Sequence, residues 1–348
     1  MFHRVSALAF VALLLGLAAH AGAATPAGPR LAISVSTDGP GAEDEGSEVI
    51  TTGPSGEDPQ RLIGGPGALI GDALSWSASG NRLAFDVSGV ESTASGPFGT
   101  GWQVVGVAEV DGGRPRVFPR AFLNAGEPVM APDGASVVFQ RIQLVKVLGR
   151  ESYLFRSSIW TLDVETGSVR RLTPWRLADF LDPSSYSPDG STLAAESSGR
   201  RGSYAVAIDL RSRRVSRLAR NASEPTYSPD GTRLAFVRLK TRYFDLPKPN
   251  RPVSELWVAR ADGGGAKRLL RRKGFISFPS WDPSGSRLAF TRNLPDFTGS
   301  LEPEPGNKVM AINADGTCLT RVFADPEITV YGTAWQPGVG REAGPISC

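Results

Sequence analysis

The sequence predicts an all-β fold, a six-bladed β-propeller with four-stranded antiparallel blades and a ring closed by a blade shared between the N- and C-termini. Three observations predict it. One ten-residue pattern recurs five times, a sixth copy is divided between the two ends of the chain, and glycine and proline separate the apolar runs at regular intervals. Length alone does not distinguish one large all-β domain from two ordinary ones, so the repeats decide the domain count.

The recurring pattern is an aromatic residue, a turn built on Pro-Asp-Gly, a basic or polar residue, and then Leu-Ala-Phe. Its five full copies are Trp76–Phe85, Met130–Phe139, Tyr186–Ala195, Tyr227–Phe236 and Trp281–Phe290. The turn glycines, from Gly80 to Gly338, lie 54, 56, 41, 54 and 53 residues apart. Each interval fits one four-stranded blade with one long loop.

The sixth copy is divided between the two ends of the chain. The segment Trp335-Gln336-Pro337-Gly338 supplies its first half, and Gly28–Ile33 supplies its second half. A linear solenoid has no reason to divide a repeat in this way. A closed ring does, because sharing one blade between the termini locks the ring.

Within a blade, we name the four predicted strands a to d. Ser187-Pro188-Asp189-Gly190 has the residue types of a type I turn and joins strands a and b. Leu256–Ala259 is typical of strand c, and a second turn at Asp262-Gly263 leads to strand d, for which Val169–Leu172 is an example. Aromatic residues recur at one position of strand a, which predicts packing between blades: Trp76, Tyr186, Tyr227, Trp281 and Trp335.

These repeats resemble those of the TolB-like β-propellers, in which W/Y-S-P-D-G-x-R-L-A-F is followed by I-W-x-x-x-x-x-G and R-R-L-T. The resemblance covers residues 28–338 and implies a propeller domain of that extent, with 339–348 as a C-terminal tail. TolB has an additional N-terminal α/β domain, for which the repeats leave no room. The role of TolB in the Tol-Pal envelope system is therefore not implied by the resemblance.

The N-terminus has the features of a secretory signal peptide over residues 1–23. A cationic start at Arg4 precedes the apolar run Val5–Ala19, and small residues from Ala19 to Ala23 offer cleavage sites. The run is shorter than the roughly 20 residues that a membrane-spanning helix needs. We therefore expect a periplasmic or secreted protein with no transmembrane segment in the mature chain.

The composition excludes several kinds of chemistry. The two histidines, His3 and His20, both lie in the predicted signal peptide, which argues against Ser-His-Asp catalysis and histidine-bound metals in the mature chain. No G-x-S-x-G nucleophile motif is present. The net charge of +3 is poor evidence for nucleic-acid binding, and the acidic stretch Asp38–Glu48 does not fit the spacing of an EF-hand. We expect no cofactor, metal or nucleic-acid partner.

Cys318 and Cys348 are the only cysteines, and an even number in an exported chain predicts one disulfide. Cys318 follows the Asp315-Gly316 turn that leads into strand d of the last full blade. The ten residues from Gly338 to Cys348 can span roughly 33 Å, which is enough to reach that blade. The alternative is a catalytic thiol, but no histidine is available to activate it.

Alternating strand direction places the a–b and c–d turns on one face and the b–c and d–a connections on the other. The long loops are predicted at 88–101, 143–156, 240–253 and 293–307. Function in such scaffolds usually lies on long loops, so this face is the candidate binding surface. Basic and aromatic residues of the second to fourth full repeats are the expected contacts with an acidic protein or an anionic envelope polymer: Lys146, Arg150, Tyr153, Phe155, Arg200, Arg201, Arg242, Tyr243, Phe244, Lys248 and Arg251.

Three functions remain open at this point. The first is a non-enzymatic binding or scaffolding propeller. The second is an extracytoplasmic hydrolase or lyase that acts on a polymer through carboxylates lining the central channel. The third is a purely structural member of a larger envelope assembly, which would require a sizeable exposed apolar patch. An enzyme requires acidic residues with shifted pKa values that converge in one concave site, whereas Asp133, Asp189 and Asp230 belong to turns, so the sequence indicates no catalytic residue.

Overall fold

The computed structural model describes residues 29–36, 46–66, 68, 70–91, 100–110, 114–118, 125–149, 152–177, 179–199, 202–240, 252–293, 308–325, 328–338, 344–345 and 347–348. All regular elements in these ranges are β-strands. The same ranges contain no helix long and apolar enough to cross a membrane. The predicted signal peptide lies outside the described residues.

The strands form six antiparallel sheets, which we number as blades in chain order. Blade 1 contains β4 (Ile70–Trp76), β5 (Arg82–Glu91), β6 (Thr100–Glu109) and β7 (Arg116–Phe118). Blade 2 contains β8 (Ala125–Met130), β9 (Ser136–Gly149), β10 (Ser152–Asp163) and β11 (Val169–Arg171), with β12 (Arg176–Leu177) paired to β10. Blade 3 contains β13 (Phe180–Tyr186), β14 (Thr192–Gly199), β15 (Gly202–Asp209) and β16 (Val215–Arg220).

The remaining three sheets complete the ring. Blade 4 contains β17 (Ser223–Tyr227), β18 (Arg233–Leu239), β19 (Val253–Arg260) and β20 (Lys267–Lys273). Blade 5 contains β21 (Phe275–Trp281), β22 (Arg287–Asn293), β23 (Lys308–Asn313) and β24 (Thr320–Ala324). Blade 6 contains β25 (Thr329–Trp335) from the C-terminal end, and β1 (Leu31–Ser36), β2 (Gly46–Thr52) and β3 (Gln60–Pro66) from the N-terminal end.

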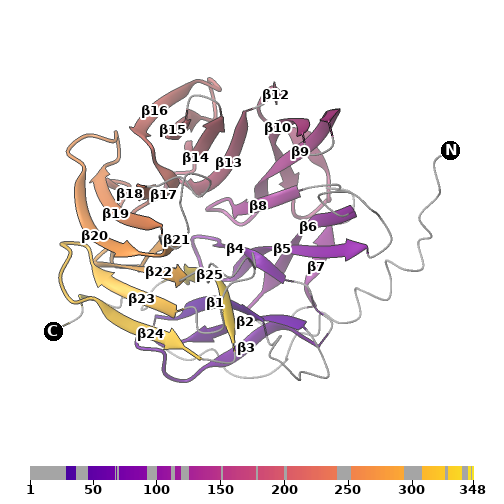
Figure 1. The fold of residues 1–348 in the computed structure, drawn as a ribbon. Coiled ribbons are helices and arrows are strands. Elements are labelled where there is room, and N and C mark those ends of the chain that lie inside the picture. The colour runs from indigo at the N-terminus through magenta and orange to yellow at the C-terminus, as the bar shows by residue number, and fades with distance from the viewer. Residues whose placement is uncertain are drawn as a thin grey trace.

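The blades are arranged around a central axis, which Figure 1 views approximately end-on. The first strand of each sheet lies nearest the axis, and consecutive first strands contact one another around the ring. We call these the inner strands: β4, β8, β13, β17, β21 and β25. The last strand of each sheet lies at the outer wall. The predicted six-bladed propeller is therefore confirmed.

The ring is closed by the antiparallel pairing of β25 with β1, in which Leu31 is opposite Trp335 and Ala32 is opposite Ala334. This pairing confirms the blade shared between the termini. The inner strand β25 also approaches β4 so closely that a Cβ on Gly332 would lie 1.8 Å from the carbonyl oxygen of Asp72. Only glycine fits at this contact between the last and first inner strands.

The Pro-Asp-Gly segments form the predicted turns. The Gly190 N–H donates to the Ser187 carbonyl oxygen at 2.8 Å, and Gly190 has a φ of 71°, a conformation that favours glycine. In blades 1 and 4, the basic residue of the repeat donates a hydrogen bond to the turn of the next blade. Arg233, for example, donates to the Gly285 carbonyl oxygen at 2.7 Å and lies 4.6 Å from the ring centre of Trp281. The repeat therefore encodes contacts between blades as well as turns.

The core lies between neighbouring blades. The phenylalanine that ends the repeat is fully buried in four blades, at Phe85, Phe139, Phe236 and Phe290. Each contributes about 1.5–3 kcal/mol through burial. The tryptophans of the inner strands bridge the blades as predicted. The Nε1–H of Trp76 donates to Ala334 and that of Trp281 donates to Thr226, at 3.2 and 3.1 Å.

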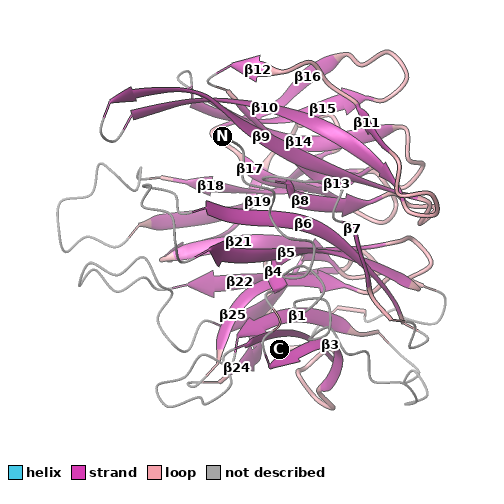
Figure 2. Cartoon of the chain, turned by 90° about the vertical axis from the view of Figure 1, so that its right-hand side faces the viewer, coloured by secondary structure: helices cyan, strands magenta, loops and turns pink. Residues whose placement is uncertain are grey.

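The two faces of the ring differ in the connections that they carry, as predicted. Short turns occupy one face, which we call the turn face, and the connections between the second and third strands of the blades occupy the other, the long-loop face. The predicted loop at 143–156 is wrong. Strands β9 and β10 continue through it as a ribbon, in which Phe155 pairs with Leu144, and this ribbon reaches beyond most other strands (Figure 2).

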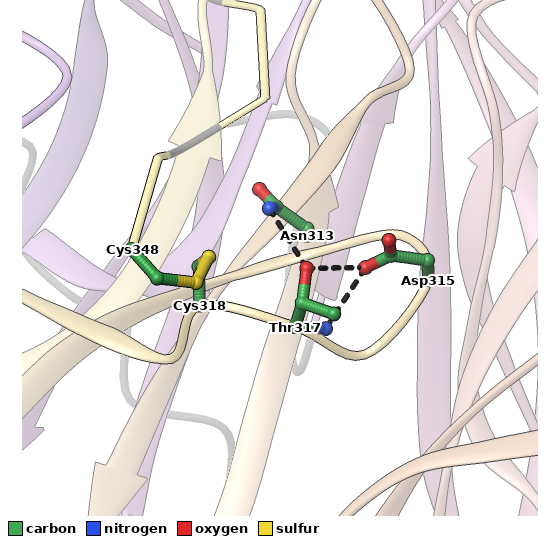
Figure 3. The surroundings of a disulfide bond; sticks show 5 residues. All are labelled: Asn313, Asp315, Thr317, Cys318 and Cys348. Carbon is green, nitrogen blue, oxygen red and sulfur yellow. Dashed lines mark hydrogen bonds between the residues drawn. A yellow bond between two sulfur atoms is a disulfide. The ribbon is translucent and has the colours of Figure 1, made fainter.

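Cys318 and Cys348 form the predicted disulfide, with 5.1 Å between their Cα atoms. The bond ties the C-terminal tail, which follows β25 of blade 6, to the start of the outer strand of blade 5 (Figure 3). The neighbouring turn is held by hydrogen bonds. The Thr317 hydroxyl and its N–H both donate to the Asp315 carboxylate, at 2.7 and 2.9 Å. The disulfide therefore joins two neighbouring blades at the ring closure.

Candidate functional site

The inner strands are irregular at the same point in each blade, and this irregularity exposes side chains to the axis. The register between the first and second strands shifts in every blade, for instance between Gly126 and Val129 in blade 2. Three of these bulges hold a non-glycine residue in the left-handed region, namely Glu127, Glu224 and Phe278 with φ of 53°, 50° and 53°. Bulges of this kind redirect side chains and often occur next to functional sites.

Six carboxyl groups from blades 1 to 4 lie around the axis, and we call them the channel carboxyls. They are Asp72 of β4, Asp86 of β5, Glu127 of β8, Asp182 of β13, Glu196 of β14 and Glu224 of β17. Five of them line a cavity of about 520 Å³, and Asp86, 2 % exposed, lies behind it. None of the described residues that line this cavity is a lysine or an arginine. The site therefore holds several acidic groups without a basic partner in its wall.

Burial raises the pKa of every channel carboxyl. Loss of water is the largest cause in each case. It raises the pKa of Asp86, Asp182 and Glu224 to about 7 and that of Glu196 to about 8. Neighbouring carboxylates add to the effect, since Asp72, Asp86, Asp182 and Glu224 all raise the pKa of Glu127 further. The cluster therefore gains or loses protons near neutral pH.

Polar contacts orient four of these groups. The Ala73 N–H donates to Asp86 Oδ1 at 3.1 Å, the Phe278 N–H donates to Glu224 Oε2, and Gln140 Nε2 donates to Asp182 Oδ1. Glycine makes room for Asp86, because a Cβ on Gly71 would lie 2.0 Å from its Oδ2 atom. A backbone N–H of Glu224 also favours the ionised form of Glu196.

The channel continues to the turn face as a second cavity of about 360 Å³. The two cavities share Glu127, Ser184, Glu224 and Phe278 in their walls. The wall on the turn face is mainly apolar, because prolines flank the inner-strand aromatics: Pro128, Pro132, Pro183, Pro188, Pro225, Pro229, Pro279, Pro283 and Pro337. The acidic cavity includes Phe275 and Asn293, which are the first residue of β21 and the last of β22, so it opens toward the long-loop face.

The long-loop face also exposes apolar side chains. On the β9–β10 ribbon, Leu144 is 46% exposed and Val145 is 47% exposed, and Leu239 at the end of β18 is 37% exposed. These are the large exposed apolar side chains of the described residues. Such residues are typical of surfaces that contact another protein when they gather near polar groups.

Three of the residues expected to bind a partner lie on the same ribbon. Lys146 is exposed on β9, Phe155 is partly buried on β10, and Tyr153 is paired with Val147. The other eight expected contacts lie outside the described residues, and their role stays a prediction: Arg150, Arg200, Arg201, Arg242, Tyr243, Phe244, Lys248 and Arg251.

The sequence indicated no cluster of acidic residues, whereas the structure brings the channel carboxyls together around one cavity. The turn residues Asp133 and Asp189 do lie at turns, but the channel carboxyls were missed because they are not neighbours in sequence. A signal was present in the repeat register. Asp72 and Asp182 each lie four residues before the position of the inner-strand aromatic residue, and Glu127 and Glu224 each lie three residues before it. Asp86 and Glu196 each lie ten residues after it, so they occupy the same position on the second strands of blades 1 and 3.

Comparisons with known proteins agree with this architecture. No family model matches the chain. The Tol-Pal system protein TolB of Anaeromyxobacter dehalogenans (strain 2CP-C) is 32% identical over 153 residues, which cover 40% of this chain and 32% of that protein. The chain thus corresponds to about a third of the length of this curated relative.

Solved structures resemble the chain over most of its length. TolB from Acinetobacter baumannii has a TM-score of 0.63 at 17% identity, over 89% of this chain and 67% of that chain. A putative TolB from Agrobacterium tumefaciens has a TM-score of 0.56 at 18% identity, over 89% of this chain and 99% of that chain. Together with the repeat pattern and the six blades, these similarities show that the chain has the fold of the TolB-like six-bladed β-propellers.

Proposed function

We propose that the chain is an exported, non-enzymatic binding propeller that docks a protein partner on its long-loop face and receives positive charge from that partner in the acidic cavity. The observation that carries this proposal is the ring of channel carboxyls around a cavity of about 520 Å³ whose described wall contains no basic side chain. A partner that brings a lysine or arginine into the cavity would supply the missing counter-charge, and that charge would be worth most where water is excluded.

The distribution of the carboxyls favours an extended cationic segment over a single small ion. No group of three or more acidic residues within the described part of the chain is arranged closely enough to hold one metal ion. The carboxyls instead come from four consecutive blades around the cavity. A peptide segment with several polar and basic groups could contact carboxyls on different sides of the channel.

The surroundings of the cavity support a protein as the partner. The exposed Leu144 and Val145 on the projecting ribbon offer apolar contact area, while the basic residues predicted on the long loops would pair with acidic groups farther from the axis. Opposite charges at the centre and the edge of a face would orient a partner as it binds. Export is supported by the signal-peptide pattern, by the disulfide, which suits an oxidising compartment, and by similarity to a protein named for the Tol-Pal system.

The test measures binding of the mature protein to a short oligolysine peptide and to partners captured from envelope extract and identified by mass spectrometry. The double variant Glu127→Gln/Glu224→Gln should bind about tenfold more weakly than the unchanged protein, a loss of about 1.4 kcal/mol. Affinity should also rise between about pH 6 and about pH 8.5, because the carboxyls with pKa near 7 to 8 must be ionised to attract a cation.

A matched control is the double variant Asp163→Asn/Asp209→Asn, which removes the same charge from exposed turns with lowered pKa values. It should bind as the unchanged protein does. The triple variant Arg242→Glu/Lys248→Glu/Arg251→Glu tests the basic loops separately and should weaken capture of the protein partner but not of oligolysine. Equal affinity in the channel double variant and the unchanged protein would contradict the proposal.

An enzyme is the second candidate, and the same carboxyls favour it. Carboxyl groups with pKa near 7 in one cavity can act as general acid and general base at neutral pH. Such an enzyme would cleave an extracytoplasmic polymer as a hydrolase or lyase. Release of new polymer ends by the unchanged protein, abolished in Glu127→Gln, would establish this function in place of pure binding.

A further inference from the structure

The outer wall of blade 3 is densely basic. Five arginines occur within ten residues, in the turn before β16 and along this strand: Arg211, Arg213, Arg214, Arg217 and Arg220. All five are exposed. Asp209, the acidic residue at the same turn, accepts hydrogen bonds from the N–H and hydroxyl of Ser212 and so is engaged in forming the turn.

The outer wall of blade 4 is also basic. Its last strand, β20, carries five exposed cations: Lys267, Arg268, Arg271, Arg272 and Lys273. Leu270 of the same strand is buried. The acidic residue opposite them, Glu255, is fully buried and already faces three cations. Its carboxylate lies 3.0 Å from Arg268, 3.9 Å from Arg271 and 3.4 Å from Lys240. One carboxylate cannot neutralise three cations, so positive charge remains.

These two strands lie in neighbouring blades and are linked by a close contact. The turn before β20 packs on β16, since a Cβ on Gly263 would lie 2.1 Å from the Leu218 carbonyl oxygen. Figure 1 shows β16 and β20 at the outer edge of adjacent blades. We call the ten cations of the two strands and the turn before β16 the basic wall. The contact between Gly263 and Leu218 places its two halves next to each other at the outer edge of the ring.

The other outer strands are less basic. Counted in the same way, with the turn before each strand, β3 and β24 carry one basic residue each, and β7 and β11 carry two each. Charged residues on an edge strand sometimes have no role other than to prevent edge-to-edge aggregation. Every blade needs this protection equally, so it does not explain why two outer strands are more basic than the others. Because the whole chain has a net charge of only +3, the positive charge is concentrated on one side of the propeller.

We propose that the basic wall binds a linear polyanion, a polymer with repeated phosphate, sulfate or carboxylate groups. Arginine predominates, and its planar guanidinium group pairs with each of these anions through two hydrogen bonds. The cations of β20 extend over seven residues, roughly 20 Å of strand, which matches a chain of charges and not a single anion. This site lies on the outer wall and is independent of the proposed role of the long-loop face.

The chemistry of the wall favours a polymer over a protein or a membrane. The apolar residues of both strands, such as Leu218 and Leu270, are wholly or partly buried, so the wall offers charge but little apolar area. Protein interfaces usually have an apolar or aromatic centre, and membrane-surface elements insert apolar side chains beside their basic ones. A flexible polyanion needs neither and can follow a convex surface.

The test titrates labelled polyphosphate, heparin and polygalacturonate against the mature protein by fluorescence anisotropy, at about 50 mM and about 300 mM salt. The three polymers separate phosphate, sulfate and carboxylate as the anionic group. We expect binding at the lower salt that weakens at the higher salt through release of counter-ions. The variant Arg211→Gln/Arg214→Gln/Arg272→Gln/Lys273→Gln should bind at least tenfold more weakly and show a shallower salt dependence.

The matched control removes four exposed cations from the outer walls of other blades, in the variant Arg114→Gln/Arg170→Gln/Arg171→Gln/Arg321→Gln. It has the same net charge as the wall variant and should lose less than about twofold in affinity. Equal losses in the two variants would show that only net charge matters, and no binding of any of the three polymers at low salt would also refute the proposal. Circular dichroism and thermal unfolding verify that both variants are folded.

Discussion

Raising the pH from about 5.5 to about 8.5 is expected to lower the free energy of unfolding of this propeller by several kcal/mol. The reason lies in the channel carboxyls, whose pKa values are about 7 for Asp86, Asp182 and Glu224 and about 8 for Glu196 in the folded chain. The unfolded chain ionises the same groups near their ordinary values of 3.8 and 4.5. Between these limits the folded state holds more protons, so stability falls as the pH rises.

A single substitution tests the origin of this dependence. Glu196→Gln keeps the size of the side chain but cannot ionise, so it should stabilise the protein by about 2–4 kcal/mol at about pH 8.5 and change little at about pH 5.5. Denaturant unfolding at both pH values, with the disulfide intact, measures the difference.

The control variant, Asp189→Asn, should change the stability at about pH 8.5 in the opposite direction. Hydrogen bonds from Ser187 and Ser191 lower the pKa of Asp189 at its turn, so this carboxylate stabilises the fold above its unfolded pKa. Asp189→Asn should therefore leave the protein less stable at about pH 8.5, not more stable. If Glu196→Gln were also destabilising at that pH, the carboxyls of the channel would not be the source of the pH dependence.

Loss of the disulfide is the second large effect. The bond closes a segment with a sequence separation of 30, so Cys318→Ser/Cys348→Ser should lower the free energy of unfolding by about 3–4 kcal/mol in the chain-entropy model. Reduction of the unchanged protein with a thiol should reproduce the loss. Denaturant unfolding with and without reductant measures both values.

Two controls test whether the loss of stability comes from the disulfide itself. The double serine variant should be insensitive to reductant, because it has no disulfide to lose. Polyanion binding should be unchanged in it, since the basic wall lies on blades 3 and 4 and the disulfide joins blades 5 and 6. Equal stability of the reduced and oxidised unchanged protein would show that the pairing of β25 with β1 alone holds the ring closed.

The repeat explains why so much of the fold could be predicted. Each full copy contains its own turn, four copies end in a buried phenylalanine, and in two copies an arginine reaches the next turn, as Arg233 reaches Gly285. These are local patterns repeated in register, and so the sequence displays the blades, their number and the shared blade formed by β25 and β1. The disulfide followed from the same register, because it located Cys318 at the start of an outer strand.

The length of the β9–β10 ribbon could not be predicted from the local sequence pattern. The segment 143–156 mixes charged and apolar residues as a loop does, yet it pairs strand to strand until only residues 150–151 separate β9 from β10. A hairpin is stabilised by pairing across the two strands, and no property of either strand alone decides how far that pairing extends.

By itself, the sequence determined the architecture: an all-β chain, six blades, a ring closed by the two termini, and a disulfide at the closure. Only the tertiary structure decided where charge is concentrated. Asp72 and Glu224 are far apart in the chain, but ring closure brings them to one cavity, where loss of water raises both pKa values and the charge of Asp72 raises that of Glu224 further. The basic wall likewise exists because β16 and β20 become neighbours. Turns and strands depend on nearby residues, whereas the electrostatic environment of a group depends on every group that folding brings close to it.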